Sequence, residues 1–147
     1  MNIQQDFEGL LKLLEDNHAR YMIVGGYAVA YHGFPRLTKD IDIFFDNSKE
    51  NVKKIIRTLV AFGFPEADLN VETFTTEGNI ITFGVEPVRV DFINQISGVK
   101  FNEAWSNKVR GKYGKVDVNF IGLKELLKNK TSTNRPKDKL DAEELSS

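Results

Sequence analysis

The chain has 147 residues, of which 41% are hydrophobic and 28% are charged, and its formal net charge is −1 at pH 7. This length and composition are typical of one globular domain with its own core. The near-neutral net charge excludes a protein whose whole surface binds polyanions. The absence of cysteine excludes disulfides, thiolate metal sites and cysteine nucleophiles.

Targeting segments and repeats are not found either. No hydrophobic run approaches the roughly 20 residues of a membrane helix, and the start, MNIQQDFEGLL, lacks the basic and apolar regions of a secretory signal. No internal repeat or Pro/Gly linker interrupts the chain. We therefore expect a cytoplasmic protein without membrane association, formed by a single domain over residues 1–147.

The predicted elements of the first half begin with an amphipathic helix over 3–17, where apolar residues recur at helical spacing. A short apolar strand at 21–24 ends at a Gly-Gly pair, and a short helix follows at 27–32. The run DIDIFF at 40–45 predicts a strand that enters the core. Residues 49–62 have the spacing of a second amphipathic helix.

The second half is predicted as strands at 71–76, 79–85, 88–94 and 115–121 and as helices at 123–129 and 136–145. Strands and helices are mixed, and several strands are adjacent in sequence. This favours an α/β or α+β fold, a small mixed sheet with helices packed on it, over a bundle or a sandwich.

Three aspartates stand out as candidate metal ligands. Asp40 and Asp42 are two residues apart on a predicted strand, so both side chains point to the same face, where two like charges favour a cation. The alternative for this pair is a strand with one solvated face. Asp91 lies in PVRVDFIN, a predicted buried strand in which an unpartnered carboxylate is costly. Its alternative partner is Arg89, two residues away on the same face. Carboxylate oxygens without thiolates suit Mg²⁺ or Mn²⁺ and disfavour zinc.

Two further features bear on phosphate binding. Gly25-Gly26 lies between a strand and a helix, where the backbone can approach a ligand, although such a pair is usually a simple turn and does not match the P-loop or dinucleotide fingerprints. The segment at 124–139, KELLKNKTSTNRPKDK, is basic. On charge alone it is more readily interpreted as a solvated helix than as a phosphate site.

Together these features resemble the signature of the polymerase-β-like nucleotidyltransferase superfamily. Val24-Gly25-Gly26 is followed by thirteen residues and then by Asp40-Ile41-Asp42-Ile43. Asp91 in VRVDFIN fits the superfamily's third carboxylate. The region GGYAVAYHGFPRLTKDIDIFF is similar to minimal bacterial members, including the abortive-infection nucleotidyltransferase toxins. Their C-terminal pattern of basic residues and aspartates is matched by Lys130, Arg135, Lys137, Asp138 and Asp141.

The resemblance implies transfer of NMP from an NTP, such as ATP, to an acceptor hydroxyl with release of pyrophosphate. Asp40 and Asp42 would bind two Mg²⁺ (or Mn²⁺) ions, and Asp91 would hold the catalytic one. The expected nucleotide-binding residues are Gly25, Gly26, Arg36, Thr38, Lys130, Arg135 and Lys137. For Arg36, a structural salt bridge is an equal alternative.

Several alternatives stay open at this point. One alternative is an inactive module of the same fold that binds a nucleotide or a partner protein, although retention of three repelling carboxylates argues against this. A toxin of a toxin–antitoxin pair would be an enzyme with an antitoxin partner. Antibiotic modification ranks lower, because no residue identifies a drug pocket. The acceptor, whether RNA, protein or a small molecule, is not identified by the sequence.

Overall fold

The computed structural model describes residues 4–34, 38–85 and 88–146. The elements are, in chain order, α1 (Gln5–Asp16), β1 (Tyr21–Val24), α2 (Gly25–Tyr31), β2 (Asp40–Phe45), α3 (Lys49–Phe62), a 3-10 turn (Glu66–Asp68), α4 (Val71–Thr75), β3 (Ile80–Val85), β4 (Val88–Ile93), α5 (Phe101–Ser106), β5 (Val109–Tyr113), β6 (Val116–Phe120), α6 (Leu123–Thr131) and α7 (Pro136–Ser146). None of the described helices is long and apolar enough to span a bilayer.

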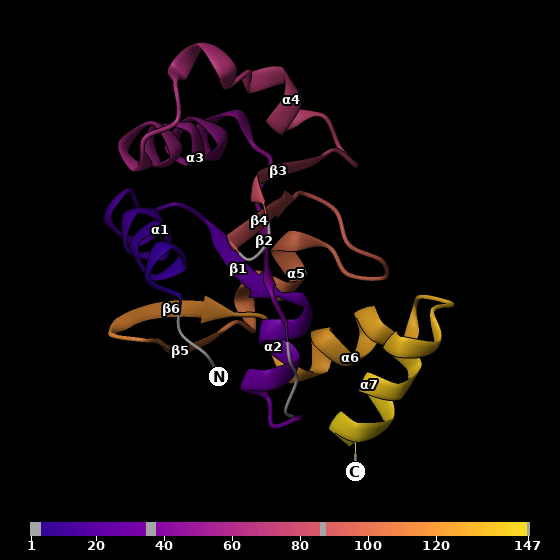
Figure 1. Ribbon diagram of the computed structural model, residues 1–147. Helices are drawn as coiled ribbons and strands as arrows, with labels where there is room; N and C mark the ends of the chain where they lie inside the picture. Colours follow the sequence, from indigo (N-terminus) through magenta and orange to yellow (C-terminus); the bar gives the residue numbers. More distant parts are fainter. Residues whose placement is uncertain (1–3, 35–37, 86–87, 147) are drawn as a thin grey trace.

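The strands form one mixed sheet in the order β3-β4-β2-β1-β6-β5. β2 runs parallel to β4, and β1 runs parallel to β6, whereas the other neighbouring pairs are antiparallel. Figure 1 shows α1 and α3 together on one side of the sheet, and α6 and α7 packed together away from them. The expected fold class, a small mixed sheet with helices packed on it, is confirmed.

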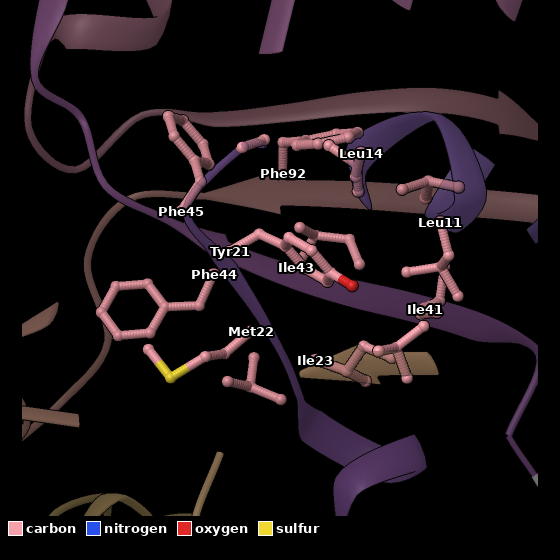
Figure 2. Packing of buried hydrophobic residues seen from close by; sticks show 14 of the residues in the cluster. Leu11, Leu14, Tyr21, Met22, Ile23, Ile41, Ile43, Phe44, Phe45 and Phe92 are labelled. Carbon is pink, nitrogen blue, oxygen red and sulfur yellow. The ribbon is translucent and has the colours of Figure 1, made fainter. Parts of the chain in front are cut away.

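Alternation along the strands gives the sheet two different faces, because successive side chains of a strand point to opposite sides. Ile23, Ile41, Ile43 and Phe92 are fully or almost fully buried on the face covered by α1 and α3. Figure 2 shows Leu11 and Leu14 of α1 beside this layer. One layer of the core therefore lies between the sheet and the two amphipathic helices. The opposite face adds Met22 and Phe44, which are also buried, and Phe44 packs against Phe101 of α5.

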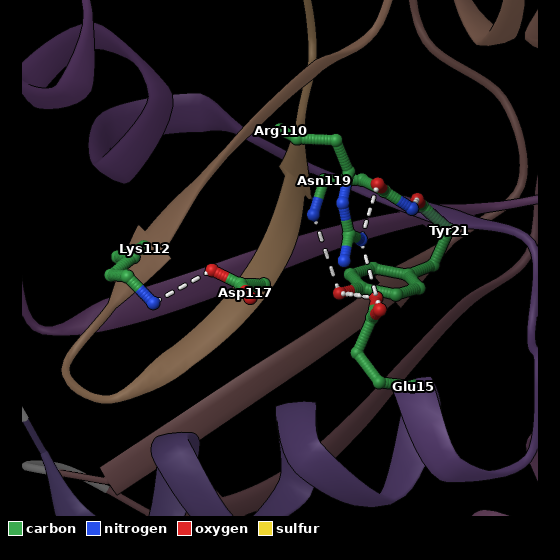
Figure 3. Close-up of polar contacts among 6 residues, drawn as sticks. All are labelled: Glu15, Tyr21, Arg110, Lys112, Asp117 and Asn119. Atoms are coloured by element: carbon green, nitrogen blue, oxygen red, sulfur yellow. Dashed lines mark hydrogen bonds and ion pairs between the residues drawn. The ribbon is translucent and has the colours of Figure 1, made fainter.

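A polar network fixes β6 and the edge strand β5 to α1. The Tyr21 hydroxyl donates to Glu15 at 2.6 Å, and the Arg110 guanidinium donates to Glu15 and to the Asn119 side-chain oxygen, both at 2.9 Å (Figure 3). Burial, followed by the hydrogen bond and charge of Glu15, raises the pKa of Tyr21 well above its ordinary value. The phenol therefore stays protonated and acts as a structural donor.

The prediction of a strand at 71–76 is wrong. This segment contains the short helix α4, in which the Asn70 side chain accepts a hydrogen bond from the amide of Glu72 at 2.8 Å. Its β-branched residues are typical of a strand, but the N-cap and the burial of Phe74 favour a helical turn. The sequence reasoning assigned no element to α5 or β5, whose apolar residues are too few to give a clear period.

Candidate active site

A row of four side chains crosses the face of the sheet opposite α1 and α3. Val24, Asp42, Asp91 and Thr82 are consecutive partners across β1, β2, β4 and β3. Paired residues of neighbouring strands point to the same face and lie about 5 Å apart. The parallel pairing of β2 with β4 therefore places the predicted Asp91 directly beside Asp42, which the sequence alone does not show.

Arg89 neutralises part of this acidic group. Its Nε lies 3.3 Å from Asp91 Oδ1 and 4.0 Å from Asp40 Oδ2, and it is the partner of Asp40 in the β2–β4 register. Asp91 Oδ1 also accepts a hydrogen bond from the Thr82 hydroxyl at 2.6 Å. The pairing with Arg89 that was considered as the alternative for Asp91 is thus present. Arg89 is shared between the two carboxylates of Asp40 and Asp91, so the pairing lies within the acidic row and does not replace it.

Asp42 is the most perturbed carboxylate of the group. Burial, reinforced by the negative charges of Asp91 and Asp40, raises its pKa from 3.8 to about 6, against the opposing influence of Lys130 and Arg89. Burial and neighbouring negative charges both make the ionised form of Asp42 unfavourable, and a cation beside the carboxylate would relieve that cost. Strong perturbation in a cleft is typical of a functional carboxylate, although structural ion pairs produce it as well.

The Gly-Gly pair lies directly against the acidic row. Gly25 has a φ of +67°, and a Cβ atom at this position would collide with the Asp42 carboxylate. At Gly26 a Cβ would lie 3.0 Å from the Thr38 side chain. Thr38 itself donates a hydrogen bond to the carbonyl of Asp40 at 3.2 Å. Helix α2 begins at Gly25, two residues earlier than predicted, so both glycines allow the start of the helix to approach Asp42 and Thr38 closely.

Lys130 of α6 is buried rather than solvated. Its ammonium group lies 3.0 Å from Asp138 and 3.4 Å from Asp141, and the exposed fractions of the three side chains are 8%, 3% and 2%. The charge-only interpretation of the basic segment as a solvated helix is therefore wrong for Lys130. Its positive charge still acts on Asp42, whose pKa it lowers, so Lys130 links the α6–α7 pair to the acidic row.

Asp138 also binds donors other than Lys130. Arg135 donates to Asp138 at 2.8 Å while its side chain is 76% exposed, and the hydroxyl of Thr133 donates to Asp138 at 2.7 Å. Burial alone would raise the pKa of Asp138, but the hydrogen bonds of Thr133, Lys130 and Arg135 outweigh it and hold the pKa below its ordinary value. Asp138 therefore stays ionised and organises three donors at the edge of the site.

These parts meet in one open cleft of about 570 Å³. It is lined by nine of the ten site residues predicted from the sequence, namely Gly25, Gly26, Thr38, Asp40, Asp42, Asp91, Lys130, Arg135 and Lys137. The tenth, Arg36, lies outside the described residues. The sequence did not indicate that Arg89 is shared with Asp40, because this contact depends on the β2–β4 register. It also gave no sign that Ile80, Ile93 and Ile96 line the cleft, because the cleft is formed by long-range packing.

The acidic group fits a hard divalent cation in its donor chemistry. Carboxylate oxygens on neighbouring strands are the ligands that Mg²⁺ and Mn²⁺ prefer, and their mutual repulsion is visible at Asp42. Within residues 4–34, 38–85 and 88–146, however, no three His, Asp or Glu side chains converge closely enough to form a ready metal site. Arg89 contacts two of the three candidates, so cation binding requires these carboxylates to exchange or share that guanidinium.

The family of the chain follows from a comparison with sequence families. A family described as nucleotidyl transferase of unknown function (DUF2204) matches residues 3–147. The chain belongs to this family. DUF2204 membership supports the transfer of a nucleotidyl group, and hence a nucleotide substrate, but leaves the acceptor undefined.

A solved structure shows a similar fold. The crystal structure of LnuA, a lincosamide antibiotic adenylyltransferase with lincomycin bound, has a TM-score of 0.57 and 17% identity to this DUF2204 chain, and the match covers 100% of this chain and 99% of LnuA. At this identity the likeness concerns the fold, which is that of a nucleotidyltransferase. No curated protein matches the sequence significantly.

Proposed function

We infer that this DUF2204 protein is a metal-dependent nucleotidyltransferase that transfers NMP from an NTP to an acceptor hydroxyl and releases pyrophosphate. The observation that carries this inference is the convergence of Asp40, Asp42 and Asp91 with the α6–α7 cations in one cleft beside Gly25. Family membership supports the reaction type. An inactive binding module is the weaker alternative, because burial of a repelling carboxylate such as Asp42 costs stability without a structural benefit.

In this proposal the two ends of the cleft have different tasks. The triphosphate lies at the end formed by Gly25, Gly26 and Lys130, where the glycine backbone allows a close approach and the ammonium group attracts the phosphates. Arg135 and Lys137 extend this positive region along the cleft. Phosphoryl-type transfer depends on such charge neutralisation and on in-line placement more than on covalent help from the protein.

The three aspartates would hold Mg²⁺ or Mn²⁺, which supplies charge stabilisation for the attacking and leaving oxygens. Asp40 and Asp42 come from the same strand, and Asp91 comes from its parallel neighbour. The acceptor oxygen forms a bond to the α-phosphorus while the bond to the bridging α,β-oxygen breaks, and the proton of the hydroxyl passes to Asp91. Thr82 fixes the orientation of Asp91 for this step.

The closer resemblance to the abortive-infection toxins rests on the C-terminal pattern. In support of a phosphate role for that pattern, Lys130, Arg135 and Lys137 all line the cleft. A preference for ATP, a role as a toxin with an antitoxin partner, and a cytoplasmic location stay predictions. The lincomycin-bound LnuA structure raises the rank of small-molecule acceptors above the position that the sequence gave them.

The test measures the binding of the four NTPs with Mg²⁺ or Mn²⁺ by calorimetry and their turnover by the release of pyrophosphate. Asp42→Asn should reduce turnover at least about a thousandfold while the circular dichroism spectrum is kept. The matched control is Asp117→Asn, which removes an exposed carboxylate paired with Lys112 on the β5–β6 hairpin and should retain wild-type turnover. Wild-type protein that is folded but binds no NTP would contradict the proposed function.

A further inference from the structure

The cleft is chemically asymmetric along the sheet. On one side of the Asp42–Asp91 row, the register continues with Asp40 and Arg89, which are charged. On the other side, it continues with Ile93 of β4 and Ile80 of β3, which are cross-strand partners. Ile96, just beyond β4, also lines the cleft. An apolar strip formed by Ile80, Ile93 and Ile96 therefore lies beside the acidic row.

The apolar strip is partly open to solvent, mainly at Ile80. The side chain of Ile80 is 65% exposed although it lines the cleft, and Ile93 and Ile96 are only partly buried. A single exposed hydrophobic residue is ordinary, but one that continues two partly buried isoleucines along the same cleft, beside candidate catalytic groups, is typical of a surface that a ligand covers. Covering a side chain such as Ile80 favours binding through the hydrophobic effect.

The basic side chains that line the cleft come from another part of the chain. Among the described residues that line it, each basic side chain comes from the α6–α7 segment, namely Lys130, Arg135 and Lys137. Arg89 lies on the far side of Asp91 from Ile93 and is held by carboxylates. An RNA acceptor needs basic groups along its phosphates, which the apolar strip does not offer.

In-line transfer connects the apolar strip to the acceptor. The attacking oxygen and the leaving pyrophosphate lie on opposite sides of the α-phosphorus. Gly25 lies against Asp42 on the β1 side of the row, so with the triphosphate there the acceptor approaches Asp91 from the side of β3, where Ile80 and Ile93 lie. The non-reacting part of the acceptor then rests on Ile80, Ile93 and Ile96.

We propose that the acceptor is a small molecule that carries its reactive hydroxyl on an uncharged body with an apolar face, and that the apolar strip binds this face. The proposal rests on the proposed function and specifies its substrate class. It makes Ile80 a specificity-determining residue, which contacts the acceptor without taking part in the chemistry.

β3 offers a matched pair of substitutions for the test. Ile80 and Val85 are both exposed, at 65% and 79%, and lie near opposite ends of the strand, but Val85 does not line the cleft. Ile80→Gln and Val85→Gln each replace an exposed aliphatic side chain by an uncharged polar one. Neither substitution touches the aspartates or the residues assigned to the triphosphate.

The experiment incubates each protein with α-labelled NTP, Mn²⁺ and a cell extract separated into molecules below 3 kDa, RNA and protein. Wild type and Val85→Gln should label the small-molecule fraction. Ile80→Gln should label it about tenfold less or worse, whereas its calorimetric affinity for the NTP with Mn²⁺ stays within about twofold of wild type.

Label in RNA or protein instead of the small-molecule fraction would overturn the substrate class. Equal labelling by Ile80→Gln and Val85→Gln would overturn the role of the apolar strip. Weaker NTP binding by Ile80→Gln with unchanged labelling would also overturn it, because the strip would then hold the nucleoside. In these three cases the proposed function stands, whereas absence of NTP binding by the wild type would refute both.

Discussion

At the scale of single residues, the ionisation of Asp42 couples the site to the stability of the fold. Its pKa is about 6 in the folded chain and 3.8 ordinarily, so the folded state binds the proton more tightly than the unfolded state. Stability contributed by the protonated form is therefore present below pH 4 and is lost as the pH rises through 6. Above pH 6 the ionised carboxylate costs about 2–3 kcal/mol.

We expect Asp42→Asn to be more stable than the wild type at pH 7.5 by about 2 kcal/mol in the presence of EDTA. The difference should shrink toward zero as the pH falls to 4, because the wild-type carboxyl is then protonated. Urea unfolding at several pH values measures this difference. A less stable variant at pH 7.5 would show that the Asp42 carboxylate forms a favourable ion pair instead. A difference that is independent of pH would show that the ionisation of Asp42 is not its cause.

Arg89 belongs to the same scale, because its single charge opposes a cation at the aspartates. It contacts Asp40 and Asp91, so we expect Arg89→Gln to bind Mn²⁺ about tenfold more tightly at pH 8, where the carboxylates are ionised. Lys112→Gln, which removes an exposed charge from β5, should leave the affinity unchanged. Calorimetric titration with Mn²⁺ alone measures these affinities. Weaker Mn²⁺ binding by Arg89→Gln would mean that the guanidinium orients the carboxylates that bind the metal.

At the scale of elements, the turn from β1 into α2 determines how closely the backbone approaches the carboxylates. Gly25 needs both its positive φ and the absence of a Cβ, which would collide with Asp42. Gly33 at the other end of this segment also has a positive φ, +111°, but nothing lies within 4 Å of a Cβ built there. Substitution of Gly33 therefore introduces backbone strain alone, whereas substitution of Gly25 introduces backbone strain and a collision with the site.

We expect Gly33→Ala to lose about 1–2 kcal/mol of stability through strain and to retain NTP binding. Gly25→Ala should be destabilised by a similar amount or more and should lose NTP binding at least about tenfold, because Asp42 has to move. Thermal unfolding and calorimetry with NTP and Mn²⁺ measure the two effects. Equal NTP affinities in the two variants would show that the approach of Gly25 to Asp42 has no part in the site.

The pair α6–α7 is the second element-scale feature. Lys130, Asp138 and Asp141 form a buried ion cluster between the two helices, and removal of one partner from such a cluster typically costs 3–5 kcal/mol. The role of Lys130 in the reaction is therefore inseparable from the packing of α7. The exposed Arg135 is the better position at which to examine nucleotide affinity alone, because its side chain is 76% exposed.

At the scale of the whole molecule, the two edges of the sheet are protected differently. β5 carries Arg110 and Lys112, and charged side chains discourage pairing with another chain. β3 has the sequence IITFGV, without a charge, and exposes Ile80 and Val85. An uncharged, exposed edge strand is the expected starting point of aggregation when the chain is heated or concentrated.

Val85→Lys should therefore raise the temperature at which aggregation begins, measured by static light scattering, without a change in NTP affinity. The reason is electrostatic, since a lysine on each edge makes β3–β3 pairing repulsive. Lys112→Gln, which weakens the protection of the other edge, should lower this temperature. An unchanged onset in Val85→Lys would indicate that aggregation starts elsewhere.

The sequence by itself determined the types of most elements and the chemistry of the candidate site. The periodicity of α1 and α3, the alternation in Asp40–Phe45 and the position of Gly25-Gly26 are local patterns, and the structure confirms the corresponding helices and strand. The prediction of a strand at 71–76 was wrong, because a side-chain cap and one buried aromatic ring outweighed β propensity there.

The tertiary structure alone decided which residues meet. Parallel pairing of β2 with β4 places Asp91 beside Asp42, and the same register adds Arg89 on one side and Ile93 with Ile80 on the other. Packing of α7 on α6 turned Lys130 from an apparently solvated residue into a buried one. These contacts are not readable from the sequence, because periodicity reports only the face on which a side chain lies, whereas long-range register and helix docking depend on the packing of the whole chain.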